Sequence, residues 1–567
     1  MFPSSVKELS ALGWDYIDVI LFCGDAFIDH PSFGAAVIAR ILQREGWRVA
    51  VVPQPNWRDD LRDFRKLGRP RLFFAVTSGA MDSMDNHYTA NKRLRSDDAY
   101  TPEGRAGYRP DYAVRTYSGI IKKLYPDVPL VIGGIEASLR RFTHYDYWSD
   151  SLFPSILTES RADVLIYGMG ERPVAETARR ISMGLPLDDI PQTAVLVSEN
   201  RATDAILLHS YEECLRSKRS FAENFDVIER EANRMSPSTL VEPSGEFFVK
   251  VNPPYPPATE EEMDSFWNLP YTRMPHPRYK GKRIPAFDMI KNSINIHRGC
   301  FGGCSFCTIA AHQGRFIQNR SEESILKEVE ILVMHPEFHG VISDVGAPTA
   351  NMYGMHGRDL SKCAKCVRKS CLSPKRCPNL LHSHSRLLDL YARIDNVKGV
   401  RHCFIGSGIR YDLFLDENGW LDETSYPYFR ELVVKHTSGR LKVAPEHTEN
   451  HVLQLMNKPP FALFVRLKDE FMELIRKEKL KYQIVPYFIS SHPGCTLKDM
   501  QNLSRNRALE DISLEQVQDF TPTPMTASSV MFYTGINPIG GGDLFVERHQ
   551  EAKKRQKSCF FLRKSKK

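Results

Sequence analysis

The chain has 567 residues, of which 42% are hydrophobic and 26% charged, a composition typical of globular proteins that excludes an intrinsically disordered chain. No apolar run reaches about eighteen residues, and the start MFPSSVKELSALGWDY lacks a basic segment followed by an apolar core. We therefore expect no membrane span and no secretory signal, and predict a cytoplasmic protein of roughly two to four domains.

The net charge of +7 is concentrated at the C-terminus. The last fifteen residues, KKRQKSCFFLRKSKK, hold eight Lys or Arg and no acidic residue, so subtracting them from +7 leaves −1 for the rest. We expect residues 551–567 to form a basic tail that is solvated and frayed. Contact of this tail with RNA or another polyanion is the alternative.

Residues 1–236 alternate short apolar runs with helical stretches, and most runs are followed by a glycine or another turn residue. This pattern predicts a doubly wound α/β domain whose buried parallel strands bind ligands at their carboxyl ends. The strands are expected at residues 17–22, 48–52, 71–77, 129–134, 162–168 and 193–197.

The segments GGIEAS and YGMGERPVAET lie after two of these expected strands. With them, the region resembles the cobalamin-binding-like domain that precedes many radical S-adenosylmethionine (radical SAM) enzymes. Cobalamin domains that bind cobalt through a histidine use Asp-x-His-x-x-Gly, whereas Asp29 and His30 are adjacent here. We therefore do not expect His30 to bind cobalt, and bound cobalamin is doubtful. A domain that binds substrate or only packs is the preferred interpretation.

Residues 237–285 contain ten prolines, including PPYPP and MPHP. Proline lacks a backbone N–H and fixes φ, so we expect neither a helix nor a central strand in this stretch. The composition predicts a linker between two domains.

The segment NIHRGCFGGCSFC, residues 295–307, places Cys300, Cys304 and Cys307 within eight residues. Thiolates suit iron–sulfur clusters or zinc, and three ligands leave the fourth iron of a cubane cluster open. Gly302 and Gly303 allow the loop to wrap closely around such a cluster. Three buried thiols or a zinc site are the alternatives.

Residues 286–550 continue with helical segments, each followed by a strand-like run. About six such β/α units predict a partial (β/α)6 barrel of the TIM type, whose chemistry lies at the carboxyl ends of its strands. Five polar residues fall at these ends: Asp344, Arg410, Glu446, His447 and His492.

The C-x3-C-x2-C spacing, with Phe306 before the third cysteine, resembles the signature of the radical SAM superfamily. More closely, HRGCFGGCSFCTIAAHQGR, DVGAPTANMYG, VAPEHT, PYFISSHPGCT, DFTPTPMTASSVMFYTG and RSDDAYTPEG resemble the uncharacterised YgiQ family. The resemblance implies a 4Fe-4S cluster on the triad and S-adenosylmethionine on the open iron. An electron from a donor such as flavodoxin or ferredoxin would cleave S-adenosylmethionine to a 5′-deoxyadenosyl radical.

The resemblance also implies roles for three residues. Phe306 would lie near the adenine. Many superfamily members end their second strand in Gly-Gly-Glu to hold the methionine amino group, whereas this chain has Asp344, Val345 and Gly346. Asp344 and Gly346 are therefore candidates for that contact. Separately from the resemblance, the position of Glu446 at the end of a strand that faces the expected active site makes it a candidate to bind the ribose or the substrate, or to transfer a proton.

A second set of cysteines, Cys363, Cys366, Cys371 and Cys377, lies in CAKCVRKSCLSPKRC. Four thiols are enough to saturate one metal ion or cluster, and the interleaved Lys and Arg residues would offset their negative charge. The spacing does not separate zinc from an auxiliary iron–sulfur cluster, and a reduced cysteine-rich insertion without metal is the alternative.

The sequence therefore predicts a radical SAM enzyme with an unknown substrate, either a small molecule or RNA. One rival is an RNA-modifying methylthiotransferase-like enzyme, which would carry three further cluster cysteines in its N-terminal domain. Only Cys23 and Cys214 occur in that region, which disfavours this rival. The other rival is a non-catalytic iron–sulfur sensor.

Overall fold

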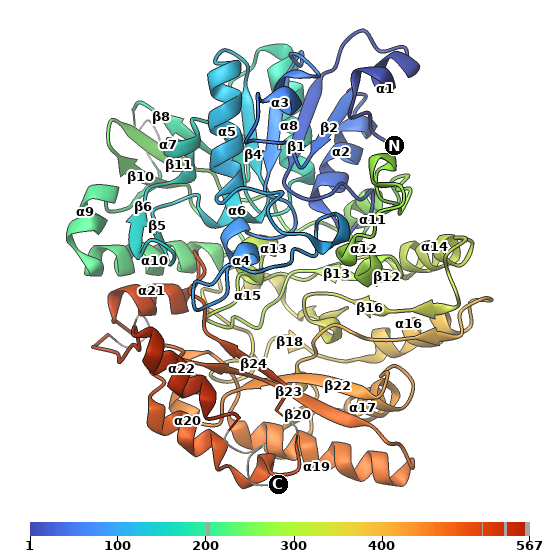
Figure 1. Ribbon diagram of the computed structural model, residues 1–567. Helices are drawn as coiled ribbons and strands as arrows, with labels where there is room; N and C mark the ends of the chain where they lie inside the picture. Colours follow the sequence, from blue (N-terminus) through green and yellow to red (C-terminus); the bar gives the residue numbers. More distant parts are fainter. Residues whose placement is uncertain (200–203, 513, 538–540, 562–567) are drawn as a thin grey trace.

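The computed structural model describes residues 1–199, 204–512, 514–537 and 541–561. Figure 1 shows two stacked halves, with the N-terminal sheet above and the barrel strands below. Within the described residues, every helix is too short or too polar to cross a membrane.

The upper half contains a nine-stranded sheet with the order β2-β1-β3-β4-β7-β8-β11-β10-β9. Its first five strands are parallel and follow the flavodoxin-like order, whose switch point lies between β1 and β3. These strands are β2 (Val49–Pro53), β1 (Val19–Cys23), β3 (Phe73–Thr77), β4 (Leu130–Gly133) and β7 (Val164–Ile166).

Helices cover both faces of this sheet, which explains why its strands are apolar on both sides. In β1, Val19 and Leu21 pack in one buried cluster, whereas Ile20 and Phe22 pack in another. The first face is covered by α2 (Gly34–Arg44) and α8 (Glu171–Met183), and the second by α5 (Ala113–Leu124) and α7 (Ile156–Ser160). The doubly wound α/β fold is confirmed.

One expected parallel strand runs the other way. The strand β8 (Thr193–Val197) is antiparallel to β7 and to β11 (Phe247–Val251). The strand β10 (Leu240–Ser244) joins β11 in a hairpin, and β9 (Ile206–Leu207) completes the edge. An antiparallel neighbour needs only a short connection, so β8 closes the parallel part of the sheet.

The prediction that residues 237–285 contain neither a central strand nor a helix was wrong. The segment supplies β10 and β11 to the sheet and forms the helix α11 (Glu260–Trp267). Pro243 is tolerated in β10 because it lies beyond Leu240 and Val241, the residues that pair with β9. The helix α11 contains no proline and begins with a capping box between Thr259 and Glu262. The extended proline-rich part begins only at Pro253.

The lower half is an open barrel of parallel strands in chain order. The pairs β12 (Ser293–Asn295) with β16 (Asp344–Gly346), and β15 (Val341–Ile342) with β19 (His402–Cys403), form its first part. A bridge between Ile409 and Val443 leads to β22 (Arg440–Glu446), β23 (Gln483–Ser490) and β24 (Gln516–Asp519). The partial (β/α)6 barrel is confirmed.

The barrel helices pack their apolar faces on one large core that includes Ile294, Val345 and Phe488. They are α14 (Glu322–Val333), α16 (Ser385–Asp395), α17 (Ser425–Val434), α18 (Asn450–Leu455), α19 (Phe461–Lys477) and α20 (Leu497–Ser504). The short helix α12 (Pro285–Ile290), which proline starts at its N1 position, precedes the first barrel strand.

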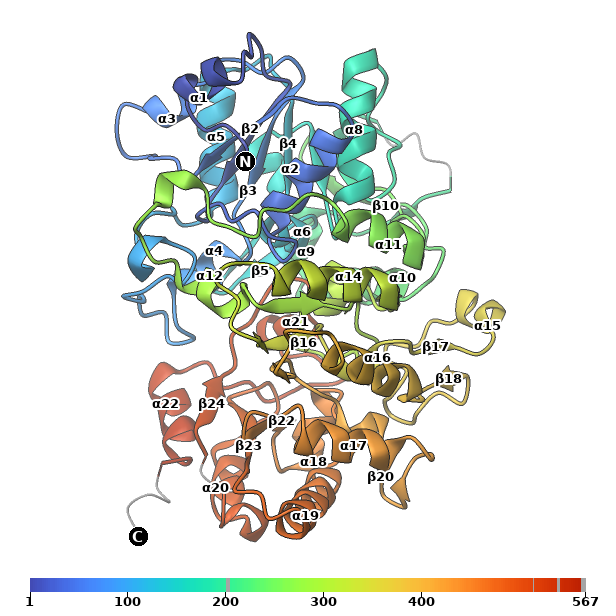
Figure 2. The same ribbon diagram turned by 90° about the vertical axis from the view of Figure 1, so that its right-hand side faces the viewer.

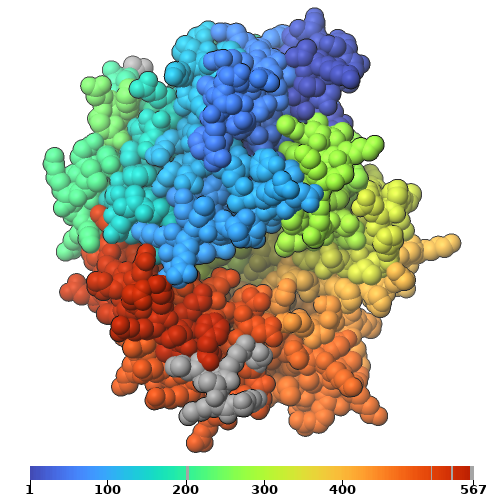
Figure 3. Space-filling model, in the orientation of Figure 1, coloured from blue at the N-terminus to red at the C-terminus, as the bar shows by residue number. Residues whose placement is uncertain are grey.

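The C-terminal segment joins the two halves. The helix α21 (Ala527–Thr534) lies beside α10 (Lys218–Ala232) of the upper half (Figure 1). In Figure 3 the C-terminal segment, in red, lies over part of the boundary between the two halves. The expectation of a solvated, frayed tail was wrong for residues 551–561. The helix α22 (Gln550–Ser558) buries Lys553, and Phe560 packs against Phe488 of the barrel core. Residues 562–567 lie outside the described residues.

The second set of cysteines lies in an insertion between β16 and β19. It projects from the barrel with α15 (Leu360–Ala364), β17 (His356–Gly357) and β18 (Leu380–Leu381), as Figure 2 shows. Shorter elements elsewhere include α1 (Val6–Ala11), α3 (Arg62–Arg65), α4 (Ser83–His87), β5 (His144–Asp146), β6 (Ser151–Phe153), α9 (Tyr211–Arg216), β14 (Gln318–Asn319), β20 (Leu415–Asp416) and β21 (Gly419–Trp420).

Candidate active site

The cysteine triad lies in the loop after β12 and β13 (His297–Arg298), at the carboxyl end of the first barrel strand. Two glycines of this loop have no room for a side chain. A Cβ at Gly302 would come within 2.6 Å of Arg410 Nη1, and one at Gly303, where φ is +65°, would collide with the carbonyl oxygen of Lys369. Glycine is therefore required for the close approach of the loop to its neighbours.

Each of the first two thiols has a polar neighbour. Cys300 Sγ lies 3.4 Å from Thr349 Oγ1, and Arg410 Nη1 lies 3.3 Å from Cys304 Sγ. The guanidinium of Arg410 is oriented by Asp412, whose carboxylate accepts at 2.5 and 3.0 Å. Burial raises the pKa of Cys300 and raises that of Cys307 to about 12. The positive charge of Arg410 favours the thiolate forms of Cys300 and Cys304, which metal binding requires.

The loop between the second and third cysteines is fixed from the opposite side of the barrel. Ser305 Oγ donates to the carbonyl of Leu455 at 2.7 Å and lies 2.8 Å from Ser528 Oγ on α21. Ser528 Oγ is also 2.7 Å from His492 Nε2. The ring of Phe306 meets the His492 ring edge-on, with centroids 6.4 Å apart. The orientation of Phe306 is thus set by a hydrogen-bonded chain from α21.

Asp344 and Gly346 lie at the end of β16, next to the loop after β19. The Asp344 carboxylate accepts hydrogen bonds from the Gly406 and Ser407 backbone N–H groups, at 2.8 and 3.1 Å, and from the Ser407 hydroxyl. A Cβ at Gly346 would collide with Ser407 Oγ. Both residues therefore shape this loop, and their contact with the methionine amino group stays a prediction.

Glu446 ends β22 in an unusual conformation. A register shift interrupts the pairing before it, and its φ is +67°, which is strained for a glutamate. Its carboxylate is 7% exposed and lies 3.7 Å from Lys458 Nζ, and burial raises its pKa. His447 points elsewhere, with Nε2 3.5 Å from Cys495 Sγ. Glu446, rather than His447, has the geometry of a site residue.

A cavity of about 410 Å³ lies between the carboxyl edge of the upper sheet and the segments that flank the triad loop. We call it the sheet-edge cavity. Its upper wall is rich in glycine, which lets a ligand approach the backbone, and its lower wall includes Asn295, Arg298 and His312. His312 lies on α13 (Ile309–Gln313), which begins two residues after Cys307. The cavity therefore adjoins the triad loop through α13.

His30 does not line this cavity. Its Nδ1 accepts the Ser32 backbone N–H at 3.0 Å, while the neighbouring Asp29 forms a buried ion pair with Arg40. The imidazole of His297, which does line the cavity, has both nitrogens near the carbonyls of Arg298 and Thr349. His30 and His297 are therefore not placed to bind cobalt as the histidine of the Asp-x-His-x-x-Gly motif does. His312, whose Nδ1 has no hydrogen-bond partner, also lines the cavity but does not belong to such a motif.

The second set of cysteines lies directly against the triad loop. The Cys371 backbone N–H donates to the carbonyl of Phe301 at 3.2 Å, and Ser370 Oγ donates to that of Gly302 at 2.8 Å. Cys300, Cys371 and Cys377 border the same small apolar cluster. Arg315 Nη2 lies 3.4 Å from Cys371 Sγ, much as Arg410 lies beside Cys304. The two sets are neighbours in space although about sixty residues separate them in sequence.

Sequence reasoning missed several of these neighbours. Thr349, Ser528 and Arg315 each lie within a motif that resembles the family, but nothing in the motifs indicates a contact with the triad loop or its cysteines. Lys458 stands in an ordinary helix-to-helix connection. Their roles depend on which loops meet at the barrel mouth, and the spacing of residues in one loop carries no such information.

Solved structures share this fold. The structure of the radical S-adenosylmethionine methyltransferase TsrM from Kitasatospora setae, with cobalamin and a [4Fe-4S] cluster bound, has a TM-score of 0.51. Its sequence is 15% identical, and the match covers 91% of this chain and 74% of that chain. At this identity the likeness shows the fold alone.

Sequence comparison is more specific. Residues 1–293 match the family described as Radical SAM N-terminal. UPF0313 proteins from Bacteroides thetaiotaomicron and Porphyromonas gingivalis are each 54% identical over 99% of this chain, and the matches cover 93% and 90% of those proteins. A UPF0313 protein from Methanocella arvoryzae is 45% identical over 96% of this chain. The chain therefore belongs to the UPF0313 family, which is the YgiQ family of radical SAM proteins.

Proposed function

We propose that this protein is an enzyme that reductively cleaves S-adenosylmethionine at a 4Fe-4S cluster held by Cys300, Cys304 and Cys307. The observation that carries the proposal is the triad loop itself, in which three thiols lie within eight residues and two glycines admit close approach. Three thiolates leave one iron of a cubane open for a ligand. When bound, the cluster supplies one electron that breaks the C5′–S bond, giving methionine and a 5′-deoxyadenosyl radical that takes a hydrogen atom from substrate.

The chain's own residues would position the reactants. Arg410 offsets charge on the Cys304 sulfur, and Phe306 presents a fixed aromatic face beside the third thiol. Glu446, buried beside Lys458, is suited to accept hydrogen bonds from a ribose. Asp344 already accepts three hydrogen bonds from the loop at 406–407, so we propose that its effect on S-adenosylmethionine is exerted through that loop.

An anaerobic cleavage assay tests this proposal. Reconstituted protein, reduced with dithionite, should release 5′-deoxyadenosine and methionine even without substrate. Cys304→Ala should release neither. A cluster that is loaded and reducible in the wild-type protein but yields no 5′-deoxyadenosine would instead favour the non-catalytic iron–sulfur sensor.

The methylthiotransferase-like alternative makes a separate demand, because that reaction needs a second cluster on cysteines of the N-terminal domain. The two cysteines there, Cys23 and Cys214, are both fully buried in that half. Burial raises the pKa of both thiols, that of Cys214 to about 12. Their positions give no support to a cluster in the upper half.

We also propose that Cys363, Cys366, Cys371 and Cys377 hold a second iron–sulfur cluster rather than zinc. Zinc–sulfur bonds of about 2.3 Å place the four sulfurs of a tetrahedral site about 3.8 Å apart. No three of these four sulfurs lie within 4.8 Å of one another. A cubane spreads its ligands over four separate irons, so it suits the wider arrangement.

The contact between the two loops suggests what such a cluster would do. Cys371 is hydrogen-bonded to the backbone of Phe301, next to Cys300, and the insertion projects toward solvent (Figure 2). A cluster here would lie between an external electron donor and the triad. Lys362, Lys365 and Lys375 are exposed on the insertion, so an acidic donor of the flavodoxin or ferredoxin class fits this surface.

Metal analysis and two reductants together test the second centre. The variant with all four cysteines replaced by Ala should lose about half of its iron while keeping S-adenosylmethionine cleavage with dithionite, because the triad's ligands are untouched. Cleavage driven by a reduced flavodoxin should fall sharply. Unchanged iron content, or zinc in place of iron, would contradict the proposal.

We propose that the sheet-edge cavity binds the substrate, which would meet the radical at the side formed by Asn295 and Arg298, where the triad loop begins. Cobalamin is not part of the proposed reaction, since His30 lies outside the cavity and its Nδ1 accepts the Ser32 backbone N–H. The substrate is a small molecule or an RNA group small enough for the cavity. Binding of cobalamin to the purified protein, followed by its absorption spectrum, checks this choice.

A further inference from the structure

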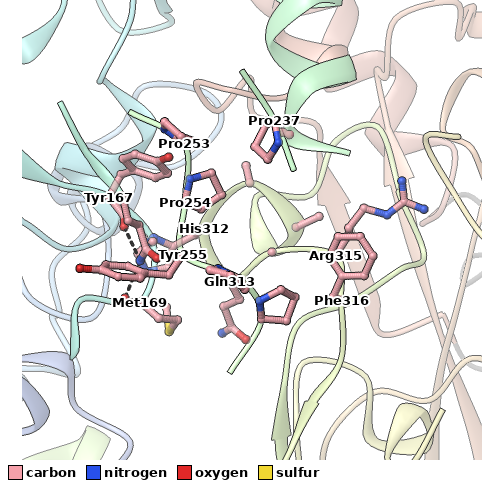
Figure 4. A pocket seen from close by; sticks show the side chains of 18 of the residues that line it. Tyr167, Met169, Pro237, Pro253, Pro254, Tyr255, His312, Gln313, Arg315 and Phe316 are labelled. Carbon is pink, nitrogen blue, oxygen red and sulfur yellow. Dashed lines mark hydrogen bonds between the residues drawn. The ribbon is translucent and has the colours of Figure 1, made fainter. Parts of the chain in front are cut away.

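A second cavity, of about 150 Å³, opens beside the sheet-edge cavity on the side of β7 and β11. We call it the arginine pocket. Figure 4 shows Tyr167 and Tyr255 on one side of it, Arg315 and Phe316 on the other, and His312 and Gln313 between them. The proline-rich segment after β11, including Pro253 and Pro254, runs along its edge.

The side chain of Arg141, which lines this pocket, is a buried cation without a counter-ion. It is 5% exposed, and no acidic residue in the described part of the chain forms an ion pair with it. Its Nη1 donates to the Ser138 carbonyl at 2.6 Å, and Nε has no hydrogen-bond partner. The guanidinium lies 4.7 Å from the Tyr167 ring centroid.

The preceding residue provides a contrast. Arg140 is equally buried, but both of its Nη groups bond to the Asp82 carboxylate. A buried guanidinium is costly unless it is paired, and Arg140 is paired with a carboxylate within the fold, although its Nε, like that of Arg141, has no hydrogen-bond partner. Arg141 lacks such a pair among the described residues, so its remaining N–H groups are available to a group that enters the pocket.

Other residues of the pocket reinforce this charge. Five arginines and two glutamates line it, and because Arg172 pairs with Glu262 outside the pocket, an excess of two positive charges remains. Glu171 forms an ion pair with Arg298, and Glu231 forms one with Arg234, so neither neutralises Arg141. His312 is kept neutral, because burial and the nearby arginines lower its pKa to about 4, and its Nδ1 has no partner. The pocket therefore offers donors to an anion.

The two cavities form one binding region. Gly168, Met169, Glu171, Arg298, His312 and Gln313 line both of them. At about 150 Å³ the arginine pocket is too small for a whole ligand, since ligand sites usually measure roughly 300–1,000 Å³, but it can hold one end group. The glycine-rich sheet-edge cavity has room for the rest.

We propose that the arginine pocket binds the anionic end, a carboxylate or a phosphate, of the organic substrate whose body occupies the sheet-edge cavity. Arg141 binds the oxyanion, His312 Nδ1 adds a hydrogen bond, and the rings of Tyr167 and Tyr255 contact the adjoining part of the ligand. That the anion belongs to the substrate rests on the proposed function. The binding itself does not depend on S-adenosylmethionine cleavage.

Binding measurements on the full-length, cluster-loaded protein test the pocket. The probes are benzoate, phenyl phosphate and uncharged benzamide, measured by calorimetry at low salt. Both anions should bind more tightly than benzamide, and the tighter of the two identifies the end group as carboxylate or phosphate. Arg141→Met should weaken anion binding at least about tenfold through loss of a charge-assisted hydrogen bond, and Arg141→Lys less.

Stability separates a binding role from a structural one. Arg141→Met should keep or raise the melting temperature, because it removes an unpaired buried charge. Arg179→Gln is the control, since Arg179 pairs with Glu176 on α8 and lines neither cavity, and it should leave anion binding within about twofold. Equal affinity for benzoate and benzamide, or unchanged anion binding in Arg141→Met, would overturn the proposal. So would a lower melting temperature of Arg141→Met or of Arg141→Lys with anion binding intact.

Discussion

The two sets of cysteines differ in number, surroundings and position. The triad lies in a glycine-rich loop at the barrel mouth, fixed by α21 and by Arg410. The four cysteines of the insertion are half-buried in a segment that projects from the barrel (Figure 2). One arginine lies beside a sulfur of each set, and hydrogen bonds link the two loops through Phe301 and Gly302.

The difference indicates that the two sets of cysteines have separate roles. An open triad inside the barrel is suited to bind a ligand on iron, whereas four ligands on a projecting insertion saturate a cluster that can only accept and pass electrons. The barrel mouth supplies the aromatic and acidic groups that surround a substrate. The insertion supplies exposed lysines, which suit transient contact with an acidic partner.

The largest difference is expected from single cysteine substitutions. Cys304→Ala should lower 5′-deoxyadenosine release at least about 100-fold with any reductant, because an iron loses its only ligand from the chain. Cys366→Ala should keep dithionite-driven release within about twofold and reduce flavodoxin-driven release about tenfold or more. Liquid chromatography of the nucleoside products gives both rates. If Cys366→Ala lowered 5′-deoxyadenosine release equally with both reductants, the two sets of cysteines would not have separate roles.

Substitution of the two arginines should give the next largest contrast. Arg410→Gln breaks a buried pair and leaves Asp412 unpaired, so we expect about 3–5 kcal/mol of destabilisation and loss of iron from the triad. Arg315 has no carboxylate partner among the described residues, so Arg315→Gln should lower the melting temperature less and affect only iron on the insertion. Thermal melts and electron paramagnetic resonance of each cluster distinguish the two. The comparison fails if Arg315→Gln removes the triad cluster instead.

Phe306 should have a moderate effect confined to ligand binding. Phe306→Ala should retain the cluster but weaken S-adenosylmethionine binding by about 1 kcal/mol, or roughly fivefold, because one aromatic contact is lost. Phe306→Leu preserves packing against the barrel core and serves as the control for volume. Titration of S-adenosylmethionine followed by the spectrum of the reduced cluster measures the change. Identical affinities in wild type and Phe306→Ala would exclude contact with the adenine.

The smallest effect is expected on the surface of the insertion. Replacing Lys362, Lys365 and Lys375 together by Gln should lower the flavodoxin-driven rate about two- to fivefold at low salt, and the difference should vanish at high salt. Lys327→Gln, an exposed lysine on α14, is the control. Stopped-flow reduction of the clusters gives the rates. A salt-independent loss would point to damage of the insertion rather than to a docking surface.

Local patterns in the sequence determined the two fold types. Short apolar runs predicted the strands near Val19 and Phe73, because a strand buried on both faces must be apolar throughout. The prolines misled the prediction for residues 237–285, since they spare α11 and sit at the open side of β10. The basic tail was also misjudged, because eight charges concealed the buried ring of Phe560.

The sequence by itself also determined the triad, because Cys300, Cys304 and Cys307 belong to one loop and their spacing is a local property. Only the tertiary structure decided what surrounds that loop. Arg410 meets Cys304 across about one hundred residues, and Cys371 meets Phe301 across about seventy, through contacts that depend on how the barrel closes. The unpaired charge of Arg141 is likewise a tertiary property. Arg140 and Arg141 are identical in sequence terms, and only the fold gives a carboxylate to the first and an open pocket to the second.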